Sequence, residues 1–88
     1  LKPGSAQAHN NLGMVYGKRG EMDKAIQEFE RSLALNPASA KAHSNLALML
    51  YHRGDLAQAK ALWEKALALD PGYPEARKAL ELLRSRST

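Results

Sequence analysis

Proline recurs in this chain at a fixed interval of 34 residues. Pro3, Pro37 and Pro71 each follow a leucine by two positions. Aligning residues 6–39 with residues 40–73 gives 13 identical pairs in 34 positions, where average composition would give about two to four. A repeat of this length indicates similar structural units stacked in a row, each of which contacts its neighbours.

Each unit is predicted to hold two helices. Ala and Leu dominate the chain, and the β-branched Val15 and Ile26 are the only valine and isoleucine, a bias that favours helix over strand. Gly20 and Gly54 divide the units into two amphipathic segments, and Asp55 can cap the helix that follows. The predicted helices span residues 6–18, 22–35, 40–52, 56–69 and 74–85, with a proline in the first turn of the last.

The apolar and small residues of both units resemble the tetratricopeptide repeat family, whose pattern is Trp, Leu-Gly and Tyr in the first helix, then Ala, Phe and Pro. His9 stands at the Trp position of the first unit, and the other signature residues there are Leu12, Gly13, Tyr16, Ala25, Phe29 and Pro37. His43 takes that position in the second unit, followed by Leu46, Ala47, Leu50, Ala59, Trp63 and Pro71. The departures from the pattern are His for Trp in both units, and Ala47 and Leu50 for Gly and Tyr in the second. All of them are compatible with packing.

The resemblance implies an all-α fold, a right-handed α-solenoid of antiparallel helical hairpins. Residues 6–39 and 40–73 form two repeats, residues 74–88 a capping helix and tail, and residues 1–5 the remnant of a preceding repeat. The small residues Gly13 and Ala47 are expected to face Ala25 and Ala59, while the larger signature residues, Leu12 among them, fill the remaining space.

The two ends of the stack are expected to differ. Ala76, Leu80 and Leu83 of the last helix can cover the second hairpin, as a terminal capping helix does. The first helix has no such cover, so Leu12 and Val15 are also candidates for partial exposure, which would favour self-association.

A ligand of this family would bind on the concave surface, which is lined mostly by the first helix of each repeat. The family's inward positions give a predicted peptide-binding groove of Asn10, Asn11, Met14, Lys18, Lys41, Asn45, Leu48 and His52. The same mapping adds Gln7, Gly17, Ser44 and Tyr51, and on the last helix Glu75, Lys78, Ala79, Leu82 and Arg86. Lys18 and Lys41 favour a partner with acidic residues.

Two asparagines one repeat apart stand out in this groove. Asn11 and Asn45 occupy equivalent positions, and an asparagine amide can bond a peptide backbone as donor and acceptor. The pair is similar to the asparagine ladder of O-linked N-acetylglucosamine transferase repeats, although Ala79 breaks the ladder. The alternative is that these amides bond within or between helices.

Binding of chaperone tails is not expected. The family's chaperone-tail clamp uses Lys, Asn, Asn, Lys and Arg at positions that hold Asn10, Met14, Asn45, Glu75 and Ala79 here. Only Asn45 matches, and Glu75 would repel a terminal carboxylate.

Composition excludes several other classes of function. The net charge of +4 comes from interspersed acids and bases, and the aromatics fall at packing positions, so no nucleic-acid surface is expected. No apolar run is long enough to span a bilayer. The chain has no cysteine, which leaves the redox compartment open, with the cytoplasm favoured.

No enzyme, cofactor or metal site is expected either. The chain contains no catalytic motif or phosphate-binding loop. His9 and His43 replace an aromatic packing residue, so their expected role is structural. The predicted function is a non-catalytic protein-interaction module that binds a peptide in its groove. The alternative is a structural segment that forms homo-oligomers through the first-helix face or spaces the domains of a larger protein.

Overall fold

Five helices and no strand make up residues 5–86, the part of the chain that the computed structural model describes. They are α1 (Ala6–Lys18), α2 (Met22–Leu35), α3 (Ala40–Arg53), α4 (Leu56–Leu69) and α5 (Pro74–Arg86). The predicted bounds hold to within one residue. The expectation that residues 1–5 belong to a preceding repeat lies almost entirely outside the described residues, since only Ser5 is among them.

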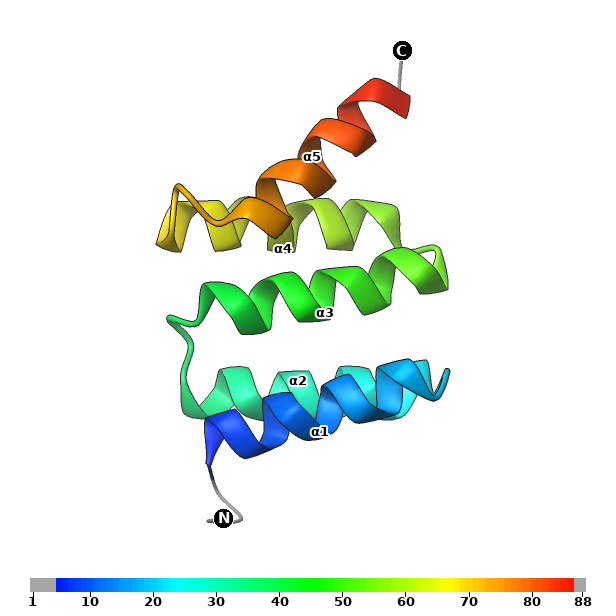
Figure 1. The fold of residues 1–88 in the computed structure, drawn as a ribbon, viewed down its shortest axis with the longest axis vertical. Helices are drawn as coiled ribbons and strands as arrows, with labels where there is room; N and C mark the ends of the chain where they lie inside the picture. The colour runs from blue at the N-terminus through cyan, green and yellow to red at the C-terminus, as the bar shows by residue number, and fades with distance from the viewer. Residues whose placement is uncertain (1–4, 87–88) are drawn as a thin grey trace.

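The helices form an α-solenoid that grows from one end of the molecule to the other. In Figure 1, α1 and α2 lie at the end with the N-terminus, α3 and α4 follow, and α5 runs obliquely across the far end. The molecule measures 44 × 27 × 16 Å along its principal axes. No helix in residues 5–86 combines the length and apolar character that crossing a membrane requires.

Serine side chains start the first helix of each repeat. The Oγ atoms of Ser5 and Ser39 accept hydrogen bonds from the backbone N–H groups of Ala8 and Ala42, at 3.3 and 3.0 Å. The expected side-chain cap by Asp55 is wrong. Asp55 occupies the N-cap position of α4 without a capping bond, because its Oδ2 accepts from Nε of Arg53 at 2.7 Å.

Glycines and polar side chains make the turns. Gly20 and Gly54 have φ of +79° and +97°, the left-handed region in which glycine alone carries no Cβ penalty. Between repeats, Oδ1 of Asn36 accepts from the N–H of Ala38, and Oδ1 of Asp70 accepts from that of Gly72. The two repeats therefore end in turns that are made by the same kind of side-chain hydrogen bond.

Small residues bring the paired helices together as predicted. A Cβ at Gly13 would lie 2.7–2.9 Å from ring atoms of Phe29, so the aromatic ring rests directly on the α1 backbone. Ala47 is fully buried at the equivalent position of α3, where Trp63 is the counterpart of Phe29. The core, which runs through both hairpins to Ala76 of α5, comprises Ala25, Ile26, Phe29, Leu46, Ala47, Met49, Leu50, Ala59, Trp63, Ala66 and Ala76.

Leu12 departs from the packing role that the signature implies. It is 40% exposed, whereas its equivalent Leu46 is 6% exposed. Leu46 is covered because α2 lies against α3 on that side, and within residues 5–86 no helix takes the corresponding place beside α1. Val15 is likewise exposed. The expected exposure of the first-helix face is therefore confirmed.

The last helix covers the second hairpin. Ala76 is fully buried, and Leu80 and Leu83 are partly buried against the core. The expected capping contacts are confirmed. However, Leu56 of α4 is still 49% exposed beneath this cap.

Candidate functional site

The eight residues of the predicted groove are called the amide face below: Asn10, Asn11, Met14, Lys18, Lys41, Asn45, Leu48 and His52. They recur at helical spacing on α1 and on α3, so each set lies along one side of its helix. Met14 and Leu48 are 38% and 41% exposed, which is high for large apolar side chains. Asn11 and the cationic members of the face are also exposed, whereas Asn45 is half-buried.

One hydrogen bond joins the two halves of the amide face. Nδ2 of Asn45 on α3 donates to Oδ1 of Asn10 on α1 at 3.1 Å. The placement of Asn10 as an open groove residue is wrong, because its side chain faces α3 and is only 6% exposed. Ser44, its equivalent in the second repeat, is also buried. This position therefore serves the contact between neighbouring first helices.

The chemistry of the amide face is apolar, amide-bearing and positively charged. It holds two exposed apolar side chains between two lysines, and none of its eight residues is acidic. Among the inward positions assigned from the sequence, the acidic residue is Glu75 of α5. Such a surface can bond a peptide backbone through amides and attract acidic side chains through lysines.

A hollow of ≈ 550 Å³ lies where α3, α4 and α5 meet, lined by Tyr51, His52, Leu56, Leu83 and Arg86. The Tyr51 ring contacts Trp63, with 5.9 Å between ring centroids. Its hydroxyl accepts a hydrogen bond from the guanidinium of Arg86. Three of the lining residues were assigned inward positions from the sequence, so the structure brings them together.

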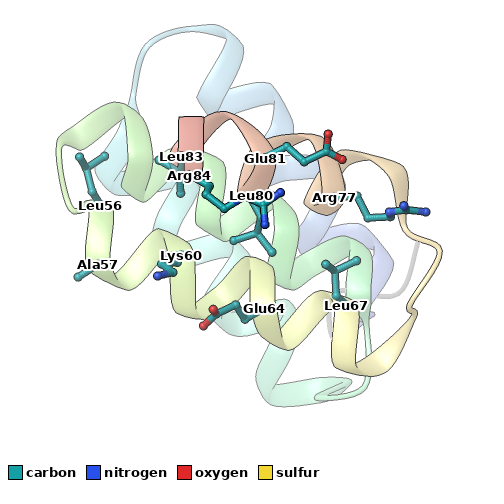
Figure 2. A pocket seen from close by; sticks show the side chains of 10 residues that line it. All are labelled: Leu56, Ala57, Lys60, Glu64, Leu67, Arg77, Leu80, Glu81, Leu83 and Arg84. Carbon is teal, nitrogen blue, oxygen red and sulfur yellow. The ribbon is translucent and has the colours of Figure 1, made fainter. Parts of the chain in front are cut away.

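The larger hollow was not foreseen from the sequence. A cleft of ≈ 680 Å³ lies between α4 and α5, and Figure 2 shows the side chains that line it. Leucines from both helices mix there with charged residues. One signal in the sequence could have revealed this cleft. Residues 74–86 repeat the first helix of the unit a third time, and the first helix of each hairpin has an apolar side that packs against the second helix of that hairpin.

A buried carboxylate in the first hairpin also escaped sequence reasoning. Glu28 is only 6% exposed; its Oε1 lies 2.8 Å from Nδ1 of His9 and its Oε2 accepts from Arg31 at 2.7 Å. The second repeat has Leu62 in place of Glu28, and Nδ1 of His43 bonds the carbonyl of Ser39 instead. Both histidines thus have the structural role expected of them. No cluster of three or more His, Asp and Glu side chains that could hold a metal occurs in residues 5–86.

Two groups near the turns have shifted pKa values. Partial burial, followed by the hydrogen bond and charge of Glu75, raises the pKa of Tyr73 to about 12. Hydrogen bonds to Asp55 and Asp23 raise the pKa of Arg53. Neither group lies on the amide face, so both shifts report on the turns and not on a catalytic site.

Comparison with known families agrees with this architecture. A family model described as "Tetratricopeptide repeat" matches residues 2–40 and 10–74, which is most of the chain. The chain belongs to the tetratricopeptide repeat family. No curated protein matches it.

Solved structures of other proteins have the same fold. The crystal structure of MamA matches with a TM-score of 0.91 and 29% identity over 99% of this chain, and a second MamA structure with 0.85 and 30% over 90%. The chain spans 51% and 43% of those two chains.

Two matching domains were solved with peptides. The first TPR of Spaghetti (RPAP3), bound to the HSP90 peptide SRMEEVD, has a TM-score of 0.89 at 23% identity, over 99% of this chain and 70% of that one. The second TPR domain of human RPAP3, in complex with the HSP70 peptide SGPTIEEVD, has 0.86 at 25%, over 92% and 68%.

Proposed function

We propose that this chain is a non-catalytic protein-interaction module that binds a peptide segment of a partner along the amide face. The observation that carries the proposal is the Asn45–Asn10 hydrogen bond of 3.1 Å. It orients the half-buried Asn45 amide on a face that also carries the exposed side chains of Met14 and Leu48. An amide held in advance loses less conformational entropy when it bonds a ligand.

The ligand proposed is a segment with acidic residues. Lys18 and Lys41 supply exposed positive charge at the two halves of the amide face, and charge complementarity raises the rate and selectivity of association. The second TPR domain of human RPAP3, in complex with an HSP70 peptide that contains Glu-Glu-Val-Asp, supports the class of ligand. Glu75 and Ala79 of α5 stand where the chaperone-tail clamp has Lys and Arg, which counts against binding of the same chaperone tail by this chain.

Asn11 and Asn45 are proposed to bond the backbone of the ligand, as the resemblance to the asparagine-ladder repeats implies. Asn45 keeps its carbonyl oxygen and one N–H after it donates to Asn10. Asn11 is exposed on the same helix as Met14. In this proposal the amides set affinity without selecting side chains, while the lysines select acidic segments.

A binding assay with an acidic peptide array tests this function. Fluorescence anisotropy would compare the wild-type chain with the variant Asn11→Ala plus Asn45→Ala, using Gln27→Ala on the outer side of α2 as control. The double variant should bind selected peptides at least about fivefold more weakly, since each lost hydrogen bond costs about 0.5–1.5 kcal/mol. Equal affinity of all three proteins would show that the amide face is not the site.

Self-assembly is a second candidate, favoured by the exposure of Leu12 at 40% and Val15 at 49% on adjacent turns of α1. Burying such a stripe against another copy, or against another domain of a larger protein, would remove it from water. Sedimentation equilibrium at rising concentration would detect a homo-oligomer, and Val15→Lys should abolish it. A wild-type protein that stays monomeric at all concentrations would exclude homo-oligomers. We propose neither an enzymatic activity nor binding to nucleic acid.

A further inference from the structure

The cleft between α4 and α5 lies on the side of α5 opposite to its inward positions. Its lining residues are Leu56, Ala57, Lys60, Glu64 and Leu67 of α4, with Arg77, Leu80, Glu81, Leu83 and Arg84 of α5. Lys78 and Leu82, which the sequence mapping assigns to the inward side, are absent from this set. The cleft therefore has no residue in common with the amide face, and it shares Leu56 and Leu83 with the smaller hollow that His52 lines.

The repeat itself shows what kind of object fits this cleft. One repeat earlier, the α3 residues equivalent to the α5 lining are His43, Leu46, Ala47, Met49 and Leu50, and all five are buried. Glu81 of α5 and Ala47 of α3 are equivalent to Gly13 of α1, which faces Phe29 of its paired helix. The position that Glu81 occupies on α5 is therefore the one that meets a second helix in each hairpin. A helix is the shape for which this side of α5 is built.

The residues at this position exclude an ordinary hairpin partner. Gly13 and Ala47 are small because an aromatic ring of the paired helix rests on them. Glu81 puts a carboxylate there, and Arg77 replaces the buried His43. A helix that brings an aromatic ring to this point would bury an unpaired charge, which is costly. The occupant must instead bring a cation to Glu81.

Charges alternate along the cleft. Figure 2 shows Lys60 and Arg84 toward the end marked by Leu56, with the Arg84 side chain reaching toward Leu80, then Glu64 and Glu81 near the middle, and Arg77 toward the end marked by Leu67. Lys60 and Glu64 are one helical turn apart on α4, and so are Arg77 and Glu81 on α5. Within residues 5–86, none of these four side chains forms an ion pair of the chain's own. The charge sequence across both walls is positive, negative, positive.

We propose that the α4–α5 cleft binds an amphipathic helix of a partner protein, with an apolar stripe and with acidic, basic and acidic residues at successive turns. The stripe covers Leu56, Leu67, Leu80 and Leu83. The central basic residue pairs with Glu81, and the outer acidic residues pair with Lys60 and Arg77. This surface goes beyond the proposed function, because a chain that binds a peptide on its amide face can bind the helix at the same time.

Two synthetic peptides probe the cleft. Both are acetylated and amidated helical 18-residue peptides with the same leucine stripe. The first carries Glu, Lys and Glu at positions i, i+4 and i+8 beside the stripe, and the second carries Lys, Glu and Lys there. Titrations followed by ¹⁵N–¹H NMR would give affinities and locate the shifted amides. The first peptide should bind roughly fivefold or more tightly than the second, since partly exposed ion pairs with the first become contacts between like charges with the second.

Protein variants check that the cleft is responsible. Glu81→Lys should weaken binding of the Glu-Lys-Glu peptide severalfold and strengthen binding of the Lys-Glu-Lys peptide. Lys78→Glu, on the same helix but on its inward side, should change neither affinity and serves as the matched control. Shifted amides should cluster in α4 and α5, whereas a ligand of the amide face would shift α1 and α3.

Three outcomes would overturn the proposal. The first is the absence of saturable binding at millimolar concentrations of either peptide. The second is equal affinity for both peptides in the wild type and in Glu81→Lys, which would indicate a nonspecific apolar contact. The third is a concentration-dependent dimer of the free protein that Glu81→Lys abolishes, which would make another copy of this chain the occupant.

Discussion

Nδ2 of Asn45 donates to Oδ1 of Asn10 across 3.1 Å, and this bond ties the first helices of the two repeats to each other. The two residues are 35 positions apart, so they are one step out of repeat register. The bond consequently links two different positions of the repeat. It makes Asn10 a structural residue, while the carbonyl oxygen and one N–H of the Asn45 amide are not used by this bond.

Asn10→Ala should lower the free energy of unfolding by about 0.5–1.5 kcal/mol, because the Asn45 amide loses its partner. Asn11→Ala is the matched control, since the neighbouring Asn11 is exposed and its loss should stay within about 0.5 kcal/mol. Urea denaturation followed by circular dichroism measures both. Equal losses in the two variants would contradict a structural role for the bond.

Gly13→Ala should destabilise the first hairpin by about 1–3 kcal/mol, because the added Cβ meets the Phe29 ring within 2.7–2.9 Å. Gly17→Ala on the same helix is the control. There the nearest atoms are Sδ and Cε of Met49 at 3.0 and 3.2 Å, the flexible end of a side chain. Alanine's higher helix propensity, about 1 kcal/mol, should offset that contact. Thermal denaturation that ranks Gly17→Ala below Gly13→Ala would refute this account.

Glu28→Ala should cost about 1–3 kcal/mol, because His9 and Arg31 lose a buried partner. Glu28→Leu should cost less than Glu28→Ala, since it copies Leu62 of the second repeat and restores apolar volume. The exposed Glu30 provides a control, and Glu30→Ala should change stability by less than about 0.5 kcal/mol. These values come from urea denaturation at pH 7, and a leucine variant less stable than the alanine variant would contradict the expected gain from restored apolar volume.

Tyr73 should make stability fall at high pH. Its pKa is raised from 10.0 to about 12, first by burial and then by Glu75. Between these two values the unfolded chain releases the phenolic proton while the folded chain retains it, so the free energy of unfolding decreases as pH rises from 10 to 12. Tyr73→Phe removes this contribution. Urea denaturation at pH 9 and pH 11 should show a smaller drop for Tyr73→Phe than for the wild type, and identical drops would mean that Tyr73 does not contribute.

Much of the fold could be predicted because the repeat reports on each position twice. The helix bounds held to within one residue, since Gly20, Gly54 and the prolines mark every turn. Conformation at these turns depends on the residue at the turn itself. The sequence also indicated that Gly13 faces its paired helix, but the expected neighbour was Ala25, and the atoms nearest to Gly13 belong to the Phe29 ring.

The candidate site was predicted less fully. The lysines and apolar residues of the amide face are exposed, as the family's inward positions imply, but the same mapping placed the buried Asn10 in the open. Periodicity gives the direction of a side chain from its own helix, and it does not report what the neighbouring helix brings to meet it. The buried Glu28 was missed for the same reason, because acidic residues are ordinarily exposed.

The sequence by itself determined the unit: its 34-residue period, its two helices, and the small and large residues that pair them. Those features follow from local conformational preference and from side-chain volume, which each residue carries with it. Only the tertiary structure decided that Asn45 donates a hydrogen bond to Asn10, that Leu12 is exposed while Leu46 is buried, and that a charged cleft lies between α4 and α5. Exposure and hydrogen-bond partners depend on which helix lies opposite, and equivalent positions of a finite stack have different neighbours.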